Sequence, residues 1–132
     1  MQALAEQARR DLEWGARWVV VEGRESGTCV GPYDDEGNIN VASLEVFAQV
    51  LGDQIDRVIW EAPLKHQQTV LIDRFGLNVG LGNIPPDRVL ALEALRLGLR
   101  FETLKPLADA LRRSSQGSPD LYEAVLIGNA ID

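Results

Sequence analysis

Three apolar segments of this sequence each end at a side chain that can do chemistry. Glu22 follows the run Trp18-Val-Val-Val, Glu61 follows Val58-Ile-Trp, and Asn83 follows a short Gly-rich run. A helical pattern comes next along the chain, which is the layout of β/α units. The carboxyl ends of parallel strands project functional side chains into one shared mouth. We therefore expect Glu22, Glu61 and Asn83 to lie along a common edge of a parallel sheet.

The two carboxylates at neighbouring strand ends have two interpretations that the spacing leaves open. Adjacent strands lie about 4.8 Å apart, so Glu22 and Glu61 can share a hard cation such as Mg²⁺ or divide acid and base roles. Alternatively, each forms a structural salt bridge, Glu22 with Arg24 and Glu61 with Lys65, because perturbed carboxylates also occur in purely structural networks.

Basic and amide residues near the same positions favour an anion as ligand. Arg24 lies in a Gly-flanked loop and can bind phosphate or carboxylate bidentately, although an exposed loop arginine is the commoner case. Lys65, Gln67 and Gln68 occupy the first turn of a predicted helix, where free N–H groups favour anions. Lys65 is also a candidate proton donor, and solvated surface is the alternative for the two glutamines. The glycines next to Asn83 allow either close ligand approach or tight packing.

The composition indicates one ordinary domain covering residues 1–132, with 45% hydrophobic and 25% charged residues. A net charge of −7 disfavours nucleic acid as a partner. No segment approaches the roughly 20 apolar residues that span a bilayer. The lone Cys29 excludes an internal disulfide and fits a reducing cytoplasm. His66 is the only histidine, so a His-based metal site is not expected.

Periodicity and turn residues predict an α/β fold with three parallel strands. The first strand, apolar throughout, suits a strand covered on both faces, and Trp14, Trp18 and Trp60 are expected to fill the core or the interfaces between helices and strands. Asn40 is a predicted helix cap. Leu64 is expected on the inner face of the third helix. The predicted strands cover residues 17–22, 57–61 and 78–81, and the predicted helices cover residues 2–14, 41–51, 63–75, 85–97, 104–111 and 119–127.

Four motifs, in order and with matching spacing, resemble the phosphosulfolactate synthase family. They span residues 11–103 and read Glu22-Gly-Arg-Glu-Ser-Gly27, Trp60-Glu-Ala-Pro-Leu-Lys-His-Gln-Gln68, Leu81-Gly-Asn-Ile84 and Leu92-Glu-Ala-Leu-Arg-Leu-Gly-Leu-Arg100. The resemblance implies a (β/α)₈ TIM barrel and a lyase that adds sulfite to phosphoenolpyruvate with Mg²⁺, in coenzyme M or sulfolactate formation. The chain departs from the family where Phe101-Glu-Thr103 replaces the usual Gly-Asp-Thr.

The resemblance also implies roles for the candidate residues. Glu22 or Glu61 would hold the cation, Lys65 would donate a proton, and Arg24, Asn83 and the Lys65 helix end would hold phosphate or sulfite. The matching part corresponds to strands six to eight, so residues 1–103 would form a partial barrel and residues 104–132 a helical tail. We expect a homo-oligomer, or a partner chain that supplies the missing half-barrel. The alternative function is a non-catalytic anion-binding or assembly module.

Overall fold

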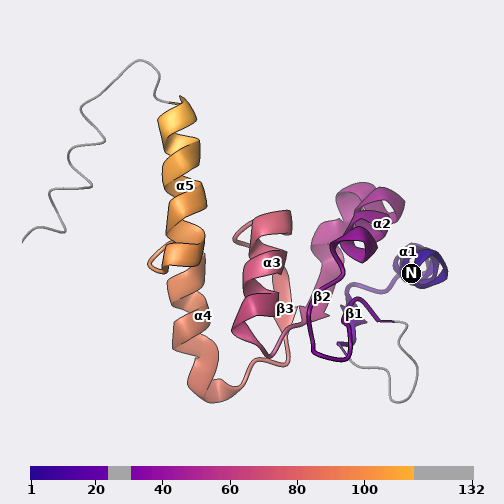
Figure 1. Ribbon diagram of the computed structural model, residues 1–132. Helices are drawn as coiled ribbons and strands as arrows, with labels where there is room; N and C mark the ends of the chain where they lie inside the picture. The colour runs from indigo at the N-terminus through magenta and orange to yellow at the C-terminus, as the bar shows by residue number, and fades with distance from the viewer. Residues whose placement is uncertain (24–30, 115–132) are drawn as a thin grey trace, which may run out of the picture.

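Three short parallel strands lie side by side at the centre of the structure, a computed structural model that describes residues 1–23 and 31–114 (Figure 1). They are β1 (Val19–Val21), β2 (Val58–Glu61) and β3 (Gly80–Gly82), in the order β1-β2-β3. Val19 is opposite Val58, and Ile59 is opposite Gly80. The predicted α/β class and parallel order are therefore confirmed, although β3 starts two residues later than predicted.

The core lies on one face of this sheet, around Trp60 of β2. The indole is completely buried and meets Phe47 of α2 (Val41–Leu51) edge to face, with ring centroids 5.1 Å apart. It stacks on Phe75 of α3 (Lys65–Phe75) at 5.5 Å. Such aromatic pairs add to the free energy gained by burial. The helices α2 and α3 thus cover this face of the sheet, and the predicted core position of Trp60 is confirmed.

The opposite face of the sheet is more open, which corrects the expectation that β1 is covered on both sides. Val20 has 53% of its surface exposed, and its neighbour in register, Ile59, is only partly buried. Ile59 lies over two glycines instead of two side chains. A Cβ on Gly80 would lie 2.6 Å from the carbonyl oxygen of Val58, and a Cβ on Gly82 would lie 3.0 Å from Ile59. Tight packing therefore accounts for both glycines.

The first helix, α1 (Gln2–Glu13), buries a stripe formed by Ala5, Ala8 and Leu12 against the rest of the core. Trp14 follows this stripe and is 81% exposed, and Trp18 precedes β1 and is 50% exposed. The expectation that the tryptophans fill the core or helix–strand interfaces is therefore wrong for Trp14, and Trp18 is at most half buried. Both stand outside the regular elements, beyond the positions whose periodicity directs side chains inward.

Two predicted helix starts have different outcomes. The Asn40 side chain accepts a hydrogen bond from the Ser43 N–H at 3.3 Å and caps α2, as predicted. The next helix, α3, begins at Lys65 and not at Pro63, because Leu64 keeps an extended backbone with φ −100° and ψ 141°. Leu64 is 45% exposed, so its predicted place on the inner face is wrong. Between α2 and β2 lies the 3₁₀ helix η1 (Gly52–Arg57).

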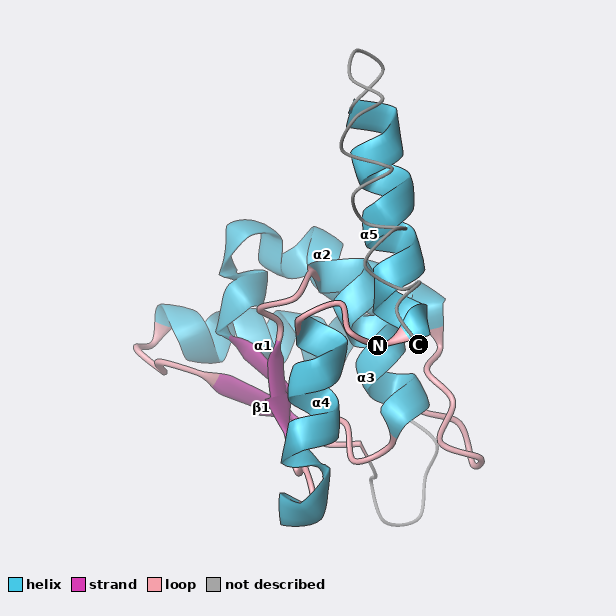
Figure 2. Cartoon of the chain, turned by 90° about the vertical axis from the view of Figure 1, so that its left-hand side faces the viewer, coloured by secondary structure: helices cyan, strands magenta, loops and turns pink. Residues whose placement is uncertain are grey.

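The C-terminal helices stand beside α3 as a column, with α5 extending beyond the sheet (Figures 1 and 2). They are the 3₁₀ turn η2 (Pro86–Arg88), α4 (Val89–Arg96) and α5 (Phe101–Ser114). The hydroxyl of Thr103 donates to the carbonyl of Leu95 at 2.7 Å and fixes the start of α5 on α4. Within residues 1–23 and 31–114, no helix is long and apolar enough to cross a bilayer. The predicted helix at 119–127 lies outside the described residues.

Candidate functional site

Strand ends carrying the predicted site residues meet at one edge of the sheet. Val21 pairs with Trp60 in register, so Glu22 directly follows β1 beside Glu61, the last residue of β2. Glu61 in turn pairs with Gly82, and Asn83 directly follows β3. The predicted common edge is therefore confirmed. Asn83 adopts a left-handed backbone with φ 54°, a conformation that asparagine tolerates better than most residues.

Glu61 also organises the loop that follows β1. One of its carboxylate oxygens accepts the N–H of Gly23 at 3.4 Å, and its backbone carbonyl accepts the hydroxyl of Tyr33. Tyr33 is buried, and a Cβ on Gly23 would approach its ring to 3.0 Å. Burial, and then the charge of Glu61, raise the pKa of the Tyr33 phenol far above its usual range. Tyr33 thus stays a neutral donor that positions the Glu61 backbone.

Tyr33 is not among the predicted site residues, because it lies between the predicted strand at residues 17–22 and the predicted helix at residues 41–51. The loop contains its own hydrogen bonds, however. The Asp34 carboxylate accepts the N–H groups of Glu36 and Asn38 at 2.9 and 2.8 Å, and Tyr33 forms an isolated bridge with Ile39. Asp and Asn commonly stabilise turns in this way, so the Asp-rich composition was a usable signal for an ordered turn.

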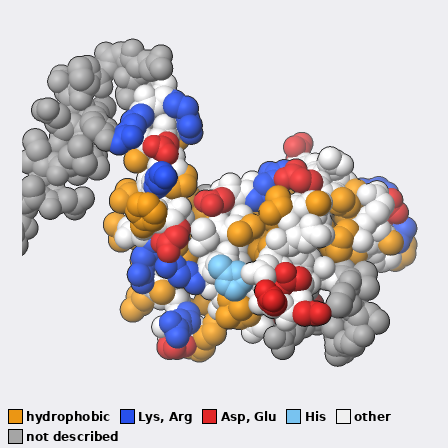
Figure 3. Space-filling view, viewed as in Figure 1, with side chains coloured by type: hydrophobic (Ala, Val, Ile, Leu, Met, Phe, Trp, Pro, Cys, Tyr) orange, Lys and Arg blue, Asp and Glu red, His pale blue; other side chains and the backbone are white. Residues whose placement is uncertain are grey.

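An acidic cavity of about 320 Å³ opens at these strand ends. Three acidic residues, Asp34, Glu36 and Glu61, line it together with Asn83, and acidic side chains gather on this face in Figure 3. Such a set of oxygen donors favours a cation or a polar ligand over a bare anion. The described residues lining the cavity are Gly23, Asp34, Glu36, Gly37, Glu61, Pro63, Leu64, Gln67 and Asn83.

Gln67 and Gln68, predicted to bind an anion, use their amide donors to hold loops. Gln67 donates to the Gly37 carbonyl at 2.8 Å and accepts the N–H of Leu64 at 3.0 Å. Gln68 donates to the carbonyl of Ala62 at 2.9 Å. Only 5% and 4% of their surfaces are exposed, so the alternative that they form solvated surface is wrong. Their anion-binding role stays a prediction.

Replacing Gln67 with alanine should lower the free energy of unfolding by about 1 to 3 kcal/mol, because the Leu64 N–H loses its acceptor and the Gly37 carbonyl loses the donor from a buried side chain. His66 contacts the same Gly37 carbonyl at 3.1 Å but is exposed. Urea denaturation followed by circular dichroism measures the effect. Gln7→Ala, at an exposed position of α1, is the matched control and should change little. Equal stability of the two variants would contradict the clamping role of Gln67.

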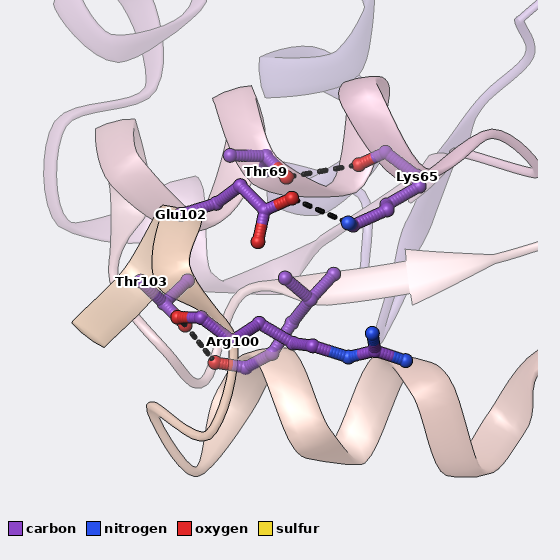
Figure 4. A network of polar contacts seen from close by, with 6 residues as sticks. Lys65, Thr69, Arg100, Glu102 and Thr103 are labelled. Carbon is purple, nitrogen blue, oxygen red and sulfur yellow. Dashed lines mark hydrogen bonds and ion pairs between the residues drawn. The ribbon is translucent and has the colours of Figure 1, made fainter. Parts of the chain in front are cut away.

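Lys65 does not point to Glu61. Its ammonium forms an ion pair with Glu102 of α5 (Figure 4), so the predicted Glu61–Lys65 salt bridge is replaced by one with a residue of a distant helix. Lys65 lines a second cavity of about 600 Å³ between α3 and α4. Pro63 and Leu64 line both cavities and form the wall between them. The described lining residues are Pro63, Leu64, Lys65, Gln68, Pro85, Arg88, Ala91, Leu95 and Arg100.

Glu22 is exposed and lines a third cavity of about 230 Å³, beside α1 and the edge strand β1. Arg24 lies outside the described residues, and so does the predicted Glu22–Arg24 pair. Residues 1–23 and 31–114 contain no group of three or more His, Cys, Asp or Glu side chains arranged to hold a metal. Glu22 and Glu61 are nevertheless hard oxygen donors at neighbouring positions, which suits Mg²⁺, an ion that keeps several waters and needs only one or two carboxylates.

Comparison with known proteins assigns the family. Residues 1–102, from the start of α1 into the first turn of α5, match the family model described as (2R)-phospho-3-sulfolactate synthase (ComA). The chain belongs to the phosphosulfolactate synthase family. The matched range contains all three strands and the four motifs, so the resemblance seen in the sequence is confirmed.

Curated members of the phosphosulfolactate synthase family show the same relationship. The chain is 48% identical over 96 residues to the phosphosulfolactate synthase of Methanothermobacter thermautotrophicus and 47% identical over 93 residues to that of Methanocaldococcus jannaschii. It is 43% identical over 99 residues to that of Bacillus subtilis. These matches cover 70 to 73% of this chain but only 36% of each relative. The chain therefore spans about a third of the length of these relatives.

Proposed function

We propose that this chain provides the carboxyl-terminal β/α units of a phosphosulfolactate synthase-type TIM barrel, a lyase that adds sulfite to phosphoenolpyruvate. The observation that supports this most directly is that Glu61 and Asn83 line one cavity at the ends of neighbouring parallel strands. Barrel enzymes place their chemistry at that end of the strands. Membership of the family supplies the reaction class.

The reaction has requirements that this edge of the sheet can meet. The sulfur of sulfite forms a bond to the methylene carbon, negative charge gathers on the substrate carboxylate, and the neighbouring carbon then takes a proton. Mg²⁺, when bound, supplies electrostatic stabilisation of that charge. Glu22 and Glu61 are the residues that would hold the ion, since both carboxylates stand at adjacent strand ends. Asn83 would orient the substrate through its amide.

Lys65 can act as the proton donor only if its side chain changes position. As a proton donor it must leave Glu102, and it must reach past the wall formed by Pro63 and Leu64. Glu61 reaches its cavity without such a change, while its bond to the Gly23 N–H holds the start of the loop after β1. The proposed chemistry therefore rests first on Glu22, Glu61 and Asn83, and only then on Lys65. The proposed location is a reducing cytoplasm, which the lone cysteine favours.

A chimera tests the proposal. The matching 96-residue segment of the Methanothermobacter relative would be replaced by the corresponding residues of this chain, and sulfite-dependent formation of phosphosulfolactate would be measured with Mg²⁺. We expect the chimera to turn over. Glu61→Gln in the chimera should lower kcat about 100-fold or more, the usual size of a lost electrostatic contribution.

The matched control in the same chimera is Glu93→Gln, which removes a carboxylate from the exposed side of α4. This control should keep turnover close to that of the unmodified chimera. If Glu61→Gln left the turnover of a folded chimera unchanged, the role of this carboxylate would be refuted. A folded but silent chimera would refute the proposed function.

A second candidate, a non-catalytic anion-binding or assembly module, is favoured by the open face of the sheet. Among the described residues, the outer edges of β1 and β3 pair with no strand, so each can accept another strand. Val20 is exposed on the open face, which leaves room for a covering element. We propose that a second copy or a partner chain completes this sheet. Sedimentation of the chain alone, followed by titration with phosphoenolpyruvate, separates the candidates, because binding without turnover in any assembly favours the module.

A further inference from the structure

Helix α5 carries an apolar stripe that is open to solvent. Phe101, Leu104, Ala108 and Leu111 follow one another at spacings of three, four and three residues, which places them on one side of the helix. Phe101, Leu104 and Leu111 are 75%, 42% and 56% exposed. Figure 3 shows hydrophobic side chains along the column of α4 and α5. The family match ends at residue 102, so nearly all of α5 lies beyond it.

The polar contacts that hold α5 to the rest of the chain lie in its first turn. Thr103 donates to the Leu95 carbonyl, and Glu102 pairs with Lys65, while the outer turns extend beyond the sheet (Figures 1 and 2). Pro106 lacks the N–H that would bond to the Glu102 carbonyl. A helix shorter than about 12 to 15 residues is marginal in water unless its apolar face is packed. The outer turns of α5 therefore need something that covers the stripe.

We propose that residues 119–127 of the same chain fold back along α5 and cover this stripe. These residues lie outside the described ones, and their sequence favours them as the occupant. Helix α5 ends at Ser114, so residues 115–118, which read Ser-Gln-Gly-Ser, connect it to the segment. Connections of about 2 to 5 residues join antiparallel neighbouring helices.

The segment fits the stripe in length and in apolar character. A helix over residues 119–127 is about 13 Å long, and Leu104 and Leu111 are roughly 10 Å apart along the axis of α5, at about 1.5 Å per residue. The segment reads Pro-Asp-Leu-Tyr-Glu-Ala-Val-Leu-Ile. Leu121 and Val125 are four residues apart and share one side of such a helix. The two apolar sides can therefore pack along their whole length.

The charges of the two segments are complementary where the chain reverses. The last turn of α5 contains Arg112 and Arg113, and Arg112 also lies 3.7 Å from Asp109. Residues 119–127 contain two carboxylates, Asp120 and Glu123, and no basic side chain. A four-residue connection returns the start of the segment to this basic turn. Exposed ion pairs add little free energy, so these charges favour the direction of packing more than its strength.

A second copy of the chain is a less favourable occupant. Lys105 and Arg112 lie seven residues apart on the flank of the stripe, and in an antiparallel pair of copies these cations would face their own counterparts. Like charges at such positions are destabilising. A segment joined through a short linker acts at an effective concentration in the millimolar range, about a thousandfold above a micromolar protein solution. The segment 119–127 therefore occupies the stripe before another copy can.

Hydrogen exchange of the α5 amides in the full chain tests the proposal. Val125→Asp should speed exchange at residues 108–114 about tenfold or more, because a charge cannot be buried against the stripe. Leu111→Ala should speed it about tenfold through lost apolar contact. Alanine favours helix more than leucine does, so on an uncovered helix Leu111→Ala would leave exchange unchanged or slow it. The β2 amides should exchange as before in both variants, which checks that the body stays folded.

Leu90→Ala is the matched control, because Leu90 is 85% exposed on α4 and its loss should leave α5 exchange unchanged. The double variant Leu111→Ala/Val125→Asp should exchange about as fast as Val125→Asp alone, since both changes remove one shared contact. Unchanged α5 exchange in Val125→Asp would overturn the proposal. Protection that rises with protein concentration would also overturn it and assign the stripe to a second copy. These measurements need neither ligand nor turnover, so their outcome is independent of the proposed lyase function.

Discussion

Replacing Trp60 with alanine should lower the free energy of unfolding by about 3 to 5 kcal/mol. The indole is completely buried and contacts aromatic rings from both helices that cover the sheet, Phe47 in α2 and Phe75 in α3. Its removal leaves a cavity at the point where three elements meet. Because single domains of this size are stable by only about 5 to 15 kcal/mol, much of the variant should be unfolded at moderate temperature, which thermal denaturation followed by circular dichroism would show.

Trp14→Ala is the matched control, since this tryptophan is 81% exposed, and it should change stability by less than about 0.5 kcal/mol. Trp60→Phe adds a finer comparison. The Trp60 indole N–H is buried without a hydrogen-bond partner among the described residues. Phenylalanine removes that unsatisfied donor, so this variant should lose much less stability than alanine. Equal losses for Trp60→Ala and Trp14→Ala would contradict the assigned core.

Replacing Gly80 with alanine should cost about 3 kcal/mol or more, although it adds only one methyl group. A Cβ at this position would lie 2.6 Å from the carbonyl oxygen of Val58 and 3.4 Å from Ile59. The first of these atoms belongs to the backbone of β2, so relief requires the two strands to separate. The pairing of Ile59 with Gly80 should then weaken, and hydrogen exchange of the β2 and β3 amides would detect it.

Gly31→Ala provides the matched control for added volume. Among residues 1–23 and 31–114, the one atom that a Cβ on Gly31 would contact is the Glu22 carbonyl oxygen, at an ordinary 3.7 Å. We expect this variant to unfold at nearly the same urea concentration as the unmodified chain. If Gly80→Ala behaved like Gly31→Ala, the close approach of β2 and β3 would be wrong.

The central sheet could be predicted from the sequence because its signals are local. The run around Val20 and the run that ends at Glu61 are apolar, β-branched and bounded by turn residues, and each is followed by a helical pattern. Asn40 and Gly76 mark helix ends through caps that depend only on nearby backbone. The order of neighbouring strands, and hence the common edge of Glu22, Glu61 and Asn83, followed from short connections.

The arrangement of side chains around that edge could not be predicted, because it depends on distant partners. Lys65 pairs with Glu102, 37 residues further along the chain, and Tyr33 reaches the backbone of Glu61 across 28 residues. The periodicity of the α3 segment predicted a helix there. It did not predict that Gln67 lines one cavity while Lys65 and Gln68 line another. Exposure of Trp14 and Val20 likewise reflects what packs nearby, since hydrophobicity alone does not specify burial.

The left-handed backbone of Asn83 decides how this position should be mutated. An alanine there would remove the amide and also introduce a steric cost of about 1 to 2 kcal/mol, so its phenotype would mix two causes. Glycine accepts φ 54° and removes only the side chain, while aspartate keeps the shape and changes the charge. Among the variants at this position, glycine and aspartate should therefore disturb the fold least. Comparing these two variants separates the chemical role of the amide from the geometry of the turn.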